Sequence, residues 1–247
     1  MMRLLTTLLL AAVCTACGGP SRDGNAFTFD EAGMAYRVEF RTENTVRILV
    51  RPAGSPLVTQ RLVVDSVPAA PVEVRREAIE HGYAFRTPQL RVEFDRTRGL
   101  FSFRDARTDA LLLEETARSL RPDTVGGEAC YAVTQRFAGT DDEALYGLGQ
   151  YQTGALNYKR DTVLLLQANK DIVNPYLVST RGFGLLWDNY SASEFRDGGD
   201  AFEFTSEVGD AVDYWFVYGG DPAGCVRGYR ALTGAASMLP KWAFGFW

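Results

Sequence analysis

Residues 89–103 read Gln89-Leu-Arg-Val-Glu-Phe-Asp95, then Arg96-Thr-Arg-Gly99, then Leu100-Phe-Ser-Phe103. The first seven residues alternate polar and apolar side chains, which is the pattern of a strand with one buried face. The next four end in glycine and favour a turn, and the last four supply a second apolar segment. The stretch therefore predicts an antiparallel β-hairpin.

The same period of two dominates the chain from Ala35 to Phe216. Many short segments of this kind, separated by Gly, Asn and Asp turns, indicate a β-sandwich or β-barrel made of antiparallel sheets. Residues 107–129 are less regular, and their pattern favours no particular element. The other expected strands are Tyr36–Arg41, Val46–Val50, Cys130–Phe137, Thr162–Leu166, Tyr176–Ser179, Gly184–Trp187, Ala201–Thr205 and Ala211–Tyr218.

One segment has a helical period instead. Asp221-Pro222 is a helix start, with a capping side chain and a proline in the first turn. Gly234 is a stop signal. We therefore expect a connector helix within 221–237, after a β-domain that spans 26–220. Its apolar face is predicted to carry Cys225, Val226, Tyr229 and Leu232.

The composition bounds the function. The net charge is −5 and no basic cluster is present, so nucleic acid is not an expected partner. His81 is the single histidine, which excludes a zinc site built from several imidazoles. Cys130 and Cys225 are expected to be two separate buried thiols, since one lies among strand residues and the other on the helix. A disulfide between them, which export would permit, is the alternative.

The first seventeen residues have the order of an export signal: Met1-Met-Arg3, then the apolar stretch Leu4–Val13, then Cys14-Thr-Ala-Cys17. Small residues before a cysteine resemble a bacterial lipoprotein cleavage box. This resemblance implies lipidation of Cys17, a flexible tether over 18–25 and a membrane-anchored location in the periplasm or outer membrane. A plain secretory signal is the alternative, because Cys14 stands where such boxes usually carry leucine.

The order of several motifs resembles the N-terminal region of glycoside hydrolase family 31, in its α-xylosidase and α-glucosidase branch. The resemblance covers roughly Ala26 to Trp247. The motifs are Leu145-Tyr-Gly-Leu-Gly-Gln150, Asn157-Tyr-Lys159, Leu166-Gln-Ala-Asn169, Asn174-Pro-Tyr-Leu-Val-Ser179, Gly182-Phe-Gly-Leu-Leu-Trp-Asp-Asn189, Asp213-Tyr-Trp-Phe-Val-Tyr-Gly219, Gly228-Tyr-Arg-Ala-Leu-Thr-Gly234 and Met238-Leu-Pro-Lys-Trp-Ala-Phe-Gly-Phe-Trp247.

This resemblance implies an all-β, galactose-mutarotase-like antiparallel β-sandwich, followed by the connector helix and the first strand of a (β/α)8 barrel. The apolar run 238–247 would begin that barrel, so the chain is expected to be the front part of a larger enzyme. The implied reaction is retaining hydrolysis of α-linked oligosaccharides without a metal or cofactor. It needs two carboxyl groups, and both family aspartates belong to the barrel. No catalytic residue is therefore assigned here, and this part alone should be inactive.

The acidic residues outside those motifs have an ordinary interpretation. Asp141-Asp142-Glu143 is typical of a solvated turn. Asp188, Asp197 and Asp200 have the setting of turn residues, and nothing marks an acid and a base as a pair. The aromatic residues Tyr151, Tyr158 and Trp187 could stack on sugars but fit a core or domain interface better.

The polar loop Gln167–Asn174 is the best candidate for substrate contact. The resemblance implies that a sandwich loop reaches the barrel mouth. Asn169 and Asp171 offer amide and carboxylate groups suited to sugar hydroxyls. An ordinary polar β-loop is the alternative for this segment. For the whole chain, the alternative function is a non-catalytic lipoprotein that binds carbohydrate.

Overall fold

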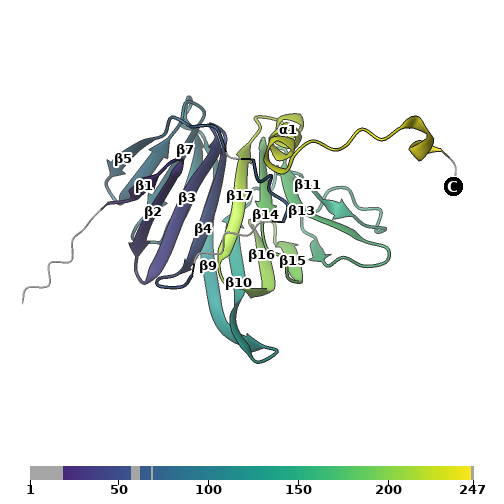
Figure 1. The fold of residues 1–247 in the computed structure, drawn as a ribbon, viewed down its shortest axis with the longest axis horizontal. Helices are drawn as coiled ribbons and strands as arrows, with labels where there is room; N and C mark the ends of the chain where they lie inside the picture. Colours follow the sequence, from purple (N-terminus) through teal and green to yellow (C-terminus); the bar gives the residue numbers. More distant parts are fainter. Residues whose placement is uncertain (1–18, 57–61, 68, 246–247) are drawn as a thin grey trace, which may run out of the picture.

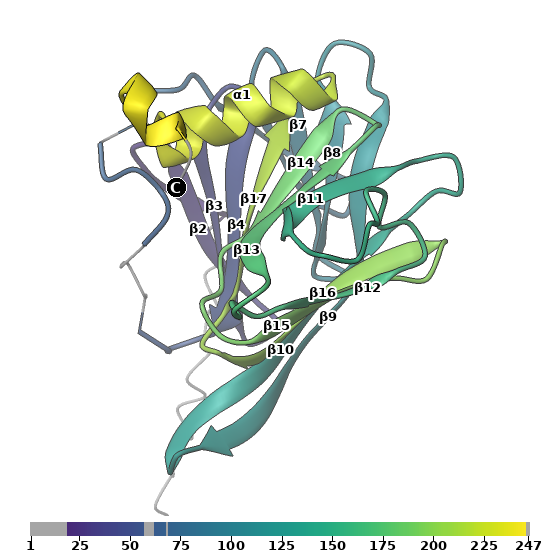
Figure 2. The ribbon, with the colours of Figure 1, turned by 90° about the vertical axis from the view of Figure 1, so that its right-hand side faces the viewer.

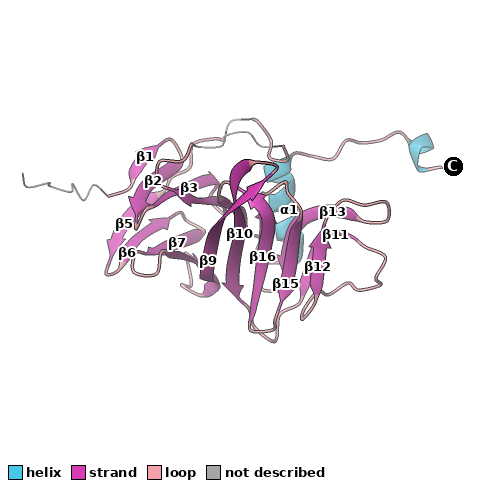
Figure 3. Cartoon of the chain, turned by 90° about the horizontal axis from the view of Figure 1, so that it is seen from below, coloured by secondary structure: helices cyan, strands magenta, loops and turns pink. Residues whose placement is uncertain are grey.

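The structure is a computed structural model that describes residues 19–56, 62–67 and 69–245. Its strands pair in antiparallel fashion and form two sheets that face each other, as Figures 1 and 3 show from two sides. Within the described residues, the first sheet has eight strands in the order β1 (Ser21–Asp23), β2 (Ala26–Glu31), β3 (Met34–Thr42), β4 (Thr45–Pro52), β17 (Val212–Tyr218), β14 (Phe183–Trp187), β13 (Ile172–Ser179) and β11 (Leu145–Gln150).

The second sheet has nine strands in the described part of the chain. The all-β sandwich expected from the sequence is thus confirmed. The order is β12 (Thr162–Leu165), β15 (Ser193–Asp197), β16 (Ala201–Gly209), β10 (Glu128–Ala138), β9 (Leu111–Val125), β8 (Leu100–Asp105), β7 (Leu90–Asp95), β6 (Gly82–Arg86) and β5 (Arg75–Ile79).

The predicted hairpin is β7 and β8, which pair from Leu90↔Asp105 to Asp95↔Leu100. Buried and partly buried residues alternate along β7. The turn is held by Asp95, whose Oδ1 accepts hydrogen bonds from the N–H of Thr97 at 2.8 Å and of Arg98 at 3.2 Å. Gly99 has φ 68°, a conformation that glycine adopts without a steric penalty.

Aromatic rings fill the space between the sheets. Phe103 stacks on Phe216 with ring centroids 4.2 Å apart, so β8 packs directly on β17. Polar side chains also cross the core. The hydroxyl of Tyr214 donates to Glu115 Oε1 at 2.6 Å, and the hydroxyl of Tyr218 donates to Asp105 Oδ2 at 2.6 Å. These bonds join β17 to the opposite sheet and satisfy buried polar groups.

The connector helix is α1 (Pro222–Thr233), which lies on the outer face of the eight-stranded sheet over β13, β14 and β17 (Figure 2). Its boundaries were predicted correctly: the Asp221 side chain caps the N–H of Gly224 at 2.5 Å, and Gly234 is the C-cap. Burial raises the pKa of the Cys225 thiol to about 11. Cys130 and Cys225 are both buried and unbridged, as expected. Val226, which was expected on the apolar face, is 53% exposed.

The structure adds detail to three segments beyond what the sequence predicted. Part of the expected tether, Ser21–Asp23, is the edge strand β1 and pairs with β2. The unassigned stretch contains β9, which forms a long hairpin with β10 that extends beyond the body of the sandwich (Figure 2). The apolar run after 238 forms no strand in the residues described up to 245, and its expected role as the start of a barrel stays a prediction. Lys241–Phe244 instead form a 3₁₀ turn, and Trp242 is 77% exposed. A 3₁₀ turn pairs some of its backbone groups locally, whereas a strand would need a neighbouring strand.

Candidate functional site

The candidate substrate loop joins β12 to β13 and is closed by its own backbone. The N–H of Ala168 donates to the carbonyl of Asp171 at 3.3 Å, and the N–H of Asp171 donates back at 3.4 Å. The Gln167 side chain accepts the N–H of Val173 at 3.1 Å. Asn169 is exposed and Asp171 is partly exposed. The loop is therefore a compact turn that presents both predicted residues at the surface.

A kink in β11 lies against the start of β13 and explains the motif Leu145–Gln150. The register between these strands shifts between Gly147 and Gly149. Gly149 has φ 118°, and a Cβ on it would lie 1.9 Å from the carbonyl oxygen of Ile172. A Cβ on Gly147 would lie 2.2 Å from the carbonyl oxygen of Tyr176. Only glycine permits this close approach, so the motif supports the loop structurally.

Aromatic residues next to the loop are held by packing. Tyr151 donates its hydroxyl to the carbonyl of Leu148 at 3.0 Å, and its ring meets the Tyr158 ring edge-on at 6.4 Å. Burial raises the pKa of Tyr151 to about 12, and the charges of Tyr158 and Asp171 act in the same direction. Tyr158 and Trp187 are buried, as predicted for core residues.

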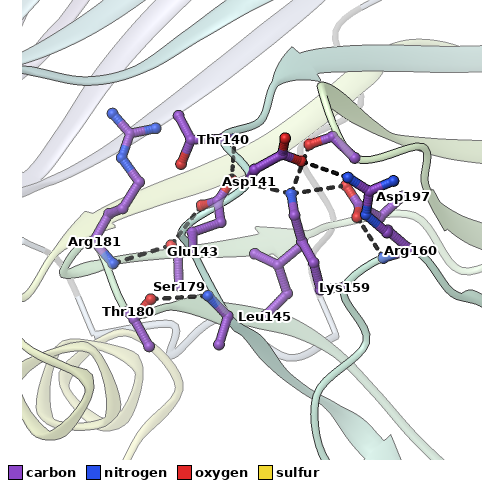
Figure 4. A network of polar contacts seen from close by, with 12 residues as sticks. Thr140, Asp141, Glu143, Leu145, Lys159, Arg160, Ser179, Thr180, Arg181 and Asp197 are labelled. Carbon is purple, nitrogen blue, oxygen red and sulfur yellow. Dashed lines mark hydrogen bonds and ion pairs between the residues drawn. The ribbon is translucent and has the colours of Figure 1, made fainter.

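Lys159 of the motif Asn157–Lys159 is the centre of a buried polar network (Figure 4). Its Nζ lies 3.8 Å from Glu143 Oε1 and 3.5 Å from Asp197 Oδ1, and it donates to the carbonyl of Gly199 at 2.7 Å. Neither carboxylate has exposed side-chain area. The Lys159 ammonium offsets part of the free-energy cost of burying the two carboxylate charges.

Each carboxylate of this network also accepts hydrogen bonds from the chain around it. Glu143 accepts one from the Ser179 hydroxyl at 2.7 Å and one from the N–H of Thr140 at 2.9 Å. Asp197 accepts the N–H of Arg160 at 2.6 Å. The network thereby fastens the connection between β11 and β12 to β13 and β15.

One interpretation of the acidic residues was wrong. Glu143 was expected in a solvated turn, yet it is buried because Lys159 and Ser179 bind it. Asp188 follows β14 and Asp197 ends β15, in keeping with their turn setting, and both are buried. The sequence offered no signal for these contacts, since their partners are distant along the chain.

The two carboxylates bound to Lys159 do not form a site for acid–base catalysis. Glu143 and Asp197 share Lys159 and are closed off from solvent, so a substrate could not reach them. His81 is exposed, and its Nε2 lies 3.6 Å from Glu80 Oε1. In the described ranges, no group of three or more His, Cys, Asp or Glu side chains is arranged to hold a metal ion.

The membrane prediction falls largely outside what the structure covers. Cys17 and the rest of the expected signal lie outside the described residues. Among the helices of the described ranges, none combines the length and the apolar character that crossing a bilayer requires.

Comparison with known proteins gives a consistent result. Residues 35–195 match the glycosyl hydrolase 31 N-terminal galactose mutarotase-like domain. An α-xylosidase of Saccharolobus solfataricus is 31% identical over 225 residues, which are 87% of this chain and 30% of that enzyme. The chain thus spans less than a third of this relative's length.

Solved structures show the same relationship. A family 31 α-xylosidase from a soil metagenome, complexed with xylose, superposes with a TM-score of 0.82 at 28% identity, over 93% of this chain and 36% of that one. The family 31 α-xylosidase of Xanthomonas citri shares the fold with a TM-score of 0.82 at 21% identity, over 92% of this chain and 41% of its own. This chain therefore belongs to glycoside hydrolase family 31 and contains the family's N-terminal galactose mutarotase-like domain.

Proposed function

We propose that this chain is the N-terminal domain of an exported retaining α-glycosidase of the α-xylosidase or α-glucosidase type. The observation that carries the proposal is the 31% identity to an α-xylosidase over 87% of the chain. Structural similarity at 28% identity to a second α-xylosidase supports it. The substrate would be an α-linked oligosaccharide, cleaved by two aspartates of a barrel that follows this domain.

The domain's own contribution would be to shape the pocket. Asn169 and Asp171 lie on a compact turn whose ends are fixed by strands, so their side chains can be aimed at sugar hydroxyls with little loss of entropy. Asn169 offers a donor and an acceptor, and Asp171 offers acceptors. They would bind the leaving-group side of the substrate.

Exposed apolar side chains support docking of this edge on a following domain. Leu164 lies on the outward face of edge strand β12 and Leu166 follows that strand. Ile172 begins β13 and Leu156 lies in the connection between β11 and β12, and both are exposed as well. The segment after α1 leaves the sandwich on the side of β11 and β13 (Figure 1). We propose that the barrel covers this surface, because several large apolar side chains in one region usually mark an interface.

Export and anchoring remain part of the proposal. The order of charged, apolar and small residues before Cys17 supports a lipidated N-terminus. Mass spectrometry of the membrane fraction would detect a lipid on Cys17. An unmodified, soluble protein cleaved elsewhere would contradict lipidation and leave the glycosidase proposal intact.

The activity is tested with the full-length polypeptide on p-nitrophenyl α-xyloside and α-glucoside. We expect hydrolysis of at least one, with the α-anomer as first product, and no activity from residues 19–245 alone. Asn169→Ala and Asp171→Ala should each raise KM for an α-linked disaccharide about fivefold. Asp123→Ala, at the exposed tip of the β9–β10 hairpin, is the matched control. Lack of hydrolysis of any α-glycoside would refute the proposal.

A further inference from the structure

A pocket lies on the outer face of the eight-stranded sheet. It has a volume of about 290 Å³, near the lower end of the range for small-molecule sites. Leu49 of β4 pairs with Asp213 of β17, and both side chains point outward because Tyr214 points into the core. The β14–β15 connection, with Asp188 and Tyr190, forms one wall.

The floor of this pocket is a buried ion pair. Arg47 is nearly inaccessible, with 3% of its side chain exposed, and its guanidinium binds both oxygens of Asp213. Glu39 lies 3.6 Å from the same guanidinium, which also sits 5.8 Å from the centre of the Trp215 ring. Burial opposes the charge of Arg47, but the hydrogen bonds and charge of Asp213 outweigh it and raise its pKa.

The wall is equally well ordered. Asp188 accepts the Tyr190 hydroxyl at 2.8 Å on one oxygen and the indole N–H of Trp215 at 3.2 Å on the other. Behind it, Asn189 and Ser191 both donate to the carbonyl of Val208, at 3.0 and 2.8 Å. An ionised carboxylate has about four acceptor positions. Asp188 therefore keeps acceptor capacity while its orientation is fixed.

The charges of the lining favour a neutral ligand. Two guanidiniums, of Arg47 and Arg51, face three carboxylates, of Asp188, Asp210 and Asp213. The small net negative charge of the lining disfavours anions. The ion pair between Arg47 and Asp213 weakens the attraction of the lining for cations. The exposed ring of Tyr190 adds an aromatic surface. Fixed acceptors, donors and an aromatic face together match a sugar ring, which has hydroxyls at its rim and C–H groups on its faces.

We propose that this pocket binds one neutral sugar residue of an oligosaccharide, at a subsite separate from the loop with Asn169 and Asp171. The two positions lie at the same end of the sheet, because β13 starts where β14 ends, beside the Asp188 connection. A chain bound at both places gains affinity from the second contact. This inference rests on the proposed function for its choice of ligand.

The test uses the full-length polypeptide and two kinds of substrate. Binding of isomaltotriose and maltotriose is followed by saturation-transfer NMR and calorimetry. Tyr190→Ala and Arg51→Ala should each weaken oligosaccharide binding about threefold to tenfold. Tyr190→Phe keeps the ring and should bind within about twofold of the parent. Arg75→Ala, with a side chain 76% exposed on edge strand β5 of the other sheet, is the matched control for Arg51→Ala.

The two kinds of failure are distinguishable. If Tyr190→Ala and Arg51→Ala fold normally and bind both trisaccharides as the parent does, the pocket does not bind sugar. Hydrolysis of p-nitrophenyl α-glycosides, which carry a single sugar residue, should stay unchanged in these variants. If the parent hydrolyses no α-glycoside yet binds the trisaccharides and loses binding with Tyr190→Ala, the proposed function fails while the sugar subsite stands.

Discussion

Replacing Gly149 by alanine tests the structural explanation of the glycine-rich motif in β11. The residue has φ 118°, and a Cβ there would lie 1.9 Å from the carbonyl oxygen of Ile172 and 2.9 Å from the backbone nitrogen of Asn174. Both atoms belong to the backbone of β13, so no side-chain movement relieves the clash. Either β11 must change its conformation or the two strands must separate.

The expected magnitude follows from these two effects. A non-glycine residue at such a φ costs about 2 kcal/mol. Separation of the strands near Ile172 would weaken about two backbone hydrogen bonds, at about 1 kcal/mol each. We therefore expect Gly149→Ala to lower the free energy of unfolding by about 4 kcal/mol. For a domain of this size, that corresponds to a Tm lower by about 8–16 °C.

Gly154→Ala is the matched control. Gly154 lies between β11 and β12 and has φ 75°, but a Cβ on it would meet no atom within 4 Å. Its substitution should therefore show the backbone strain alone, about 1–2 kcal/mol. Urea unfolding followed by tryptophan fluorescence suits both variants, because Trp187 and Trp215 are fully buried. If the two variants lost equal stability, the contact between Gly149 and β13 would not be the reason for glycine.

Two further substitutions test the polar groups. Lys159→Met leaves Glu143 and Asp197 buried without their cation and should lower the free energy of unfolding by about 3–5 kcal/mol. The control Arg160→Ala removes an ion pair whose two side chains are exposed and should change the free energy of unfolding by less than about 1 kcal/mol. Equal losses of stability in urea unfolding would refute the role of the network. Hydrogen bonds from Tyr218 and from residues of the following turn hold the pKa of Asp105 well below its usual value. A depressed pKa stabilises the fold above the unfolded-state value, near 3.9, and the gain is lost as the pH falls toward the folded-state value. Asp105→Asn should therefore be about 2 kcal/mol less stable than the parent at pH 7, and this difference in stability should become smaller below about pH 4. A difference that does not depend on pH would exclude a contribution from ionised Asp105.

The sequence predicted the strands whose side chains alternate between core and solvent. Period two was visible in β7 because Leu90, Val92 and Phe94 are all buried. It was not visible in β1 or β5, where most residues are exposed and no buried side chains alternate with them. The outer half of β9 is similar, since its hairpin projects beyond the core. Edge and projecting strands depend on tertiary placement, which a local pattern does not record.

The polar architecture was harder to predict for a related reason. Lys159 meets Asp197 from 38 residues away in the sequence. A carboxylate in a turn-like segment looks solvated until its partner is known, and so Glu143 was misassigned. The motif containing Gly147 and Gly149 was recognised only through resemblance, and its physical reason became clear when β13 was seen against it.

The elements around the candidate loop separate stability from recognition. Gly149 fixes the start of β13 from one side, while the hydroxyl of Tyr229 on α1 reaches the Asn174 side chain at 3.1 Å from another. The loop itself closes through backbone bonds between Ala168 and Asp171. The side chain of Asn169 is exposed beyond this frame. A change at Gly149 should therefore alter both the stability of the fold and the position of the loop. Asn169→Ala should leave the free energy of unfolding unchanged and weaken only the affinity for the ligand. A loss of affinity without a loss of stability would thus identify Asn169 as a binding residue.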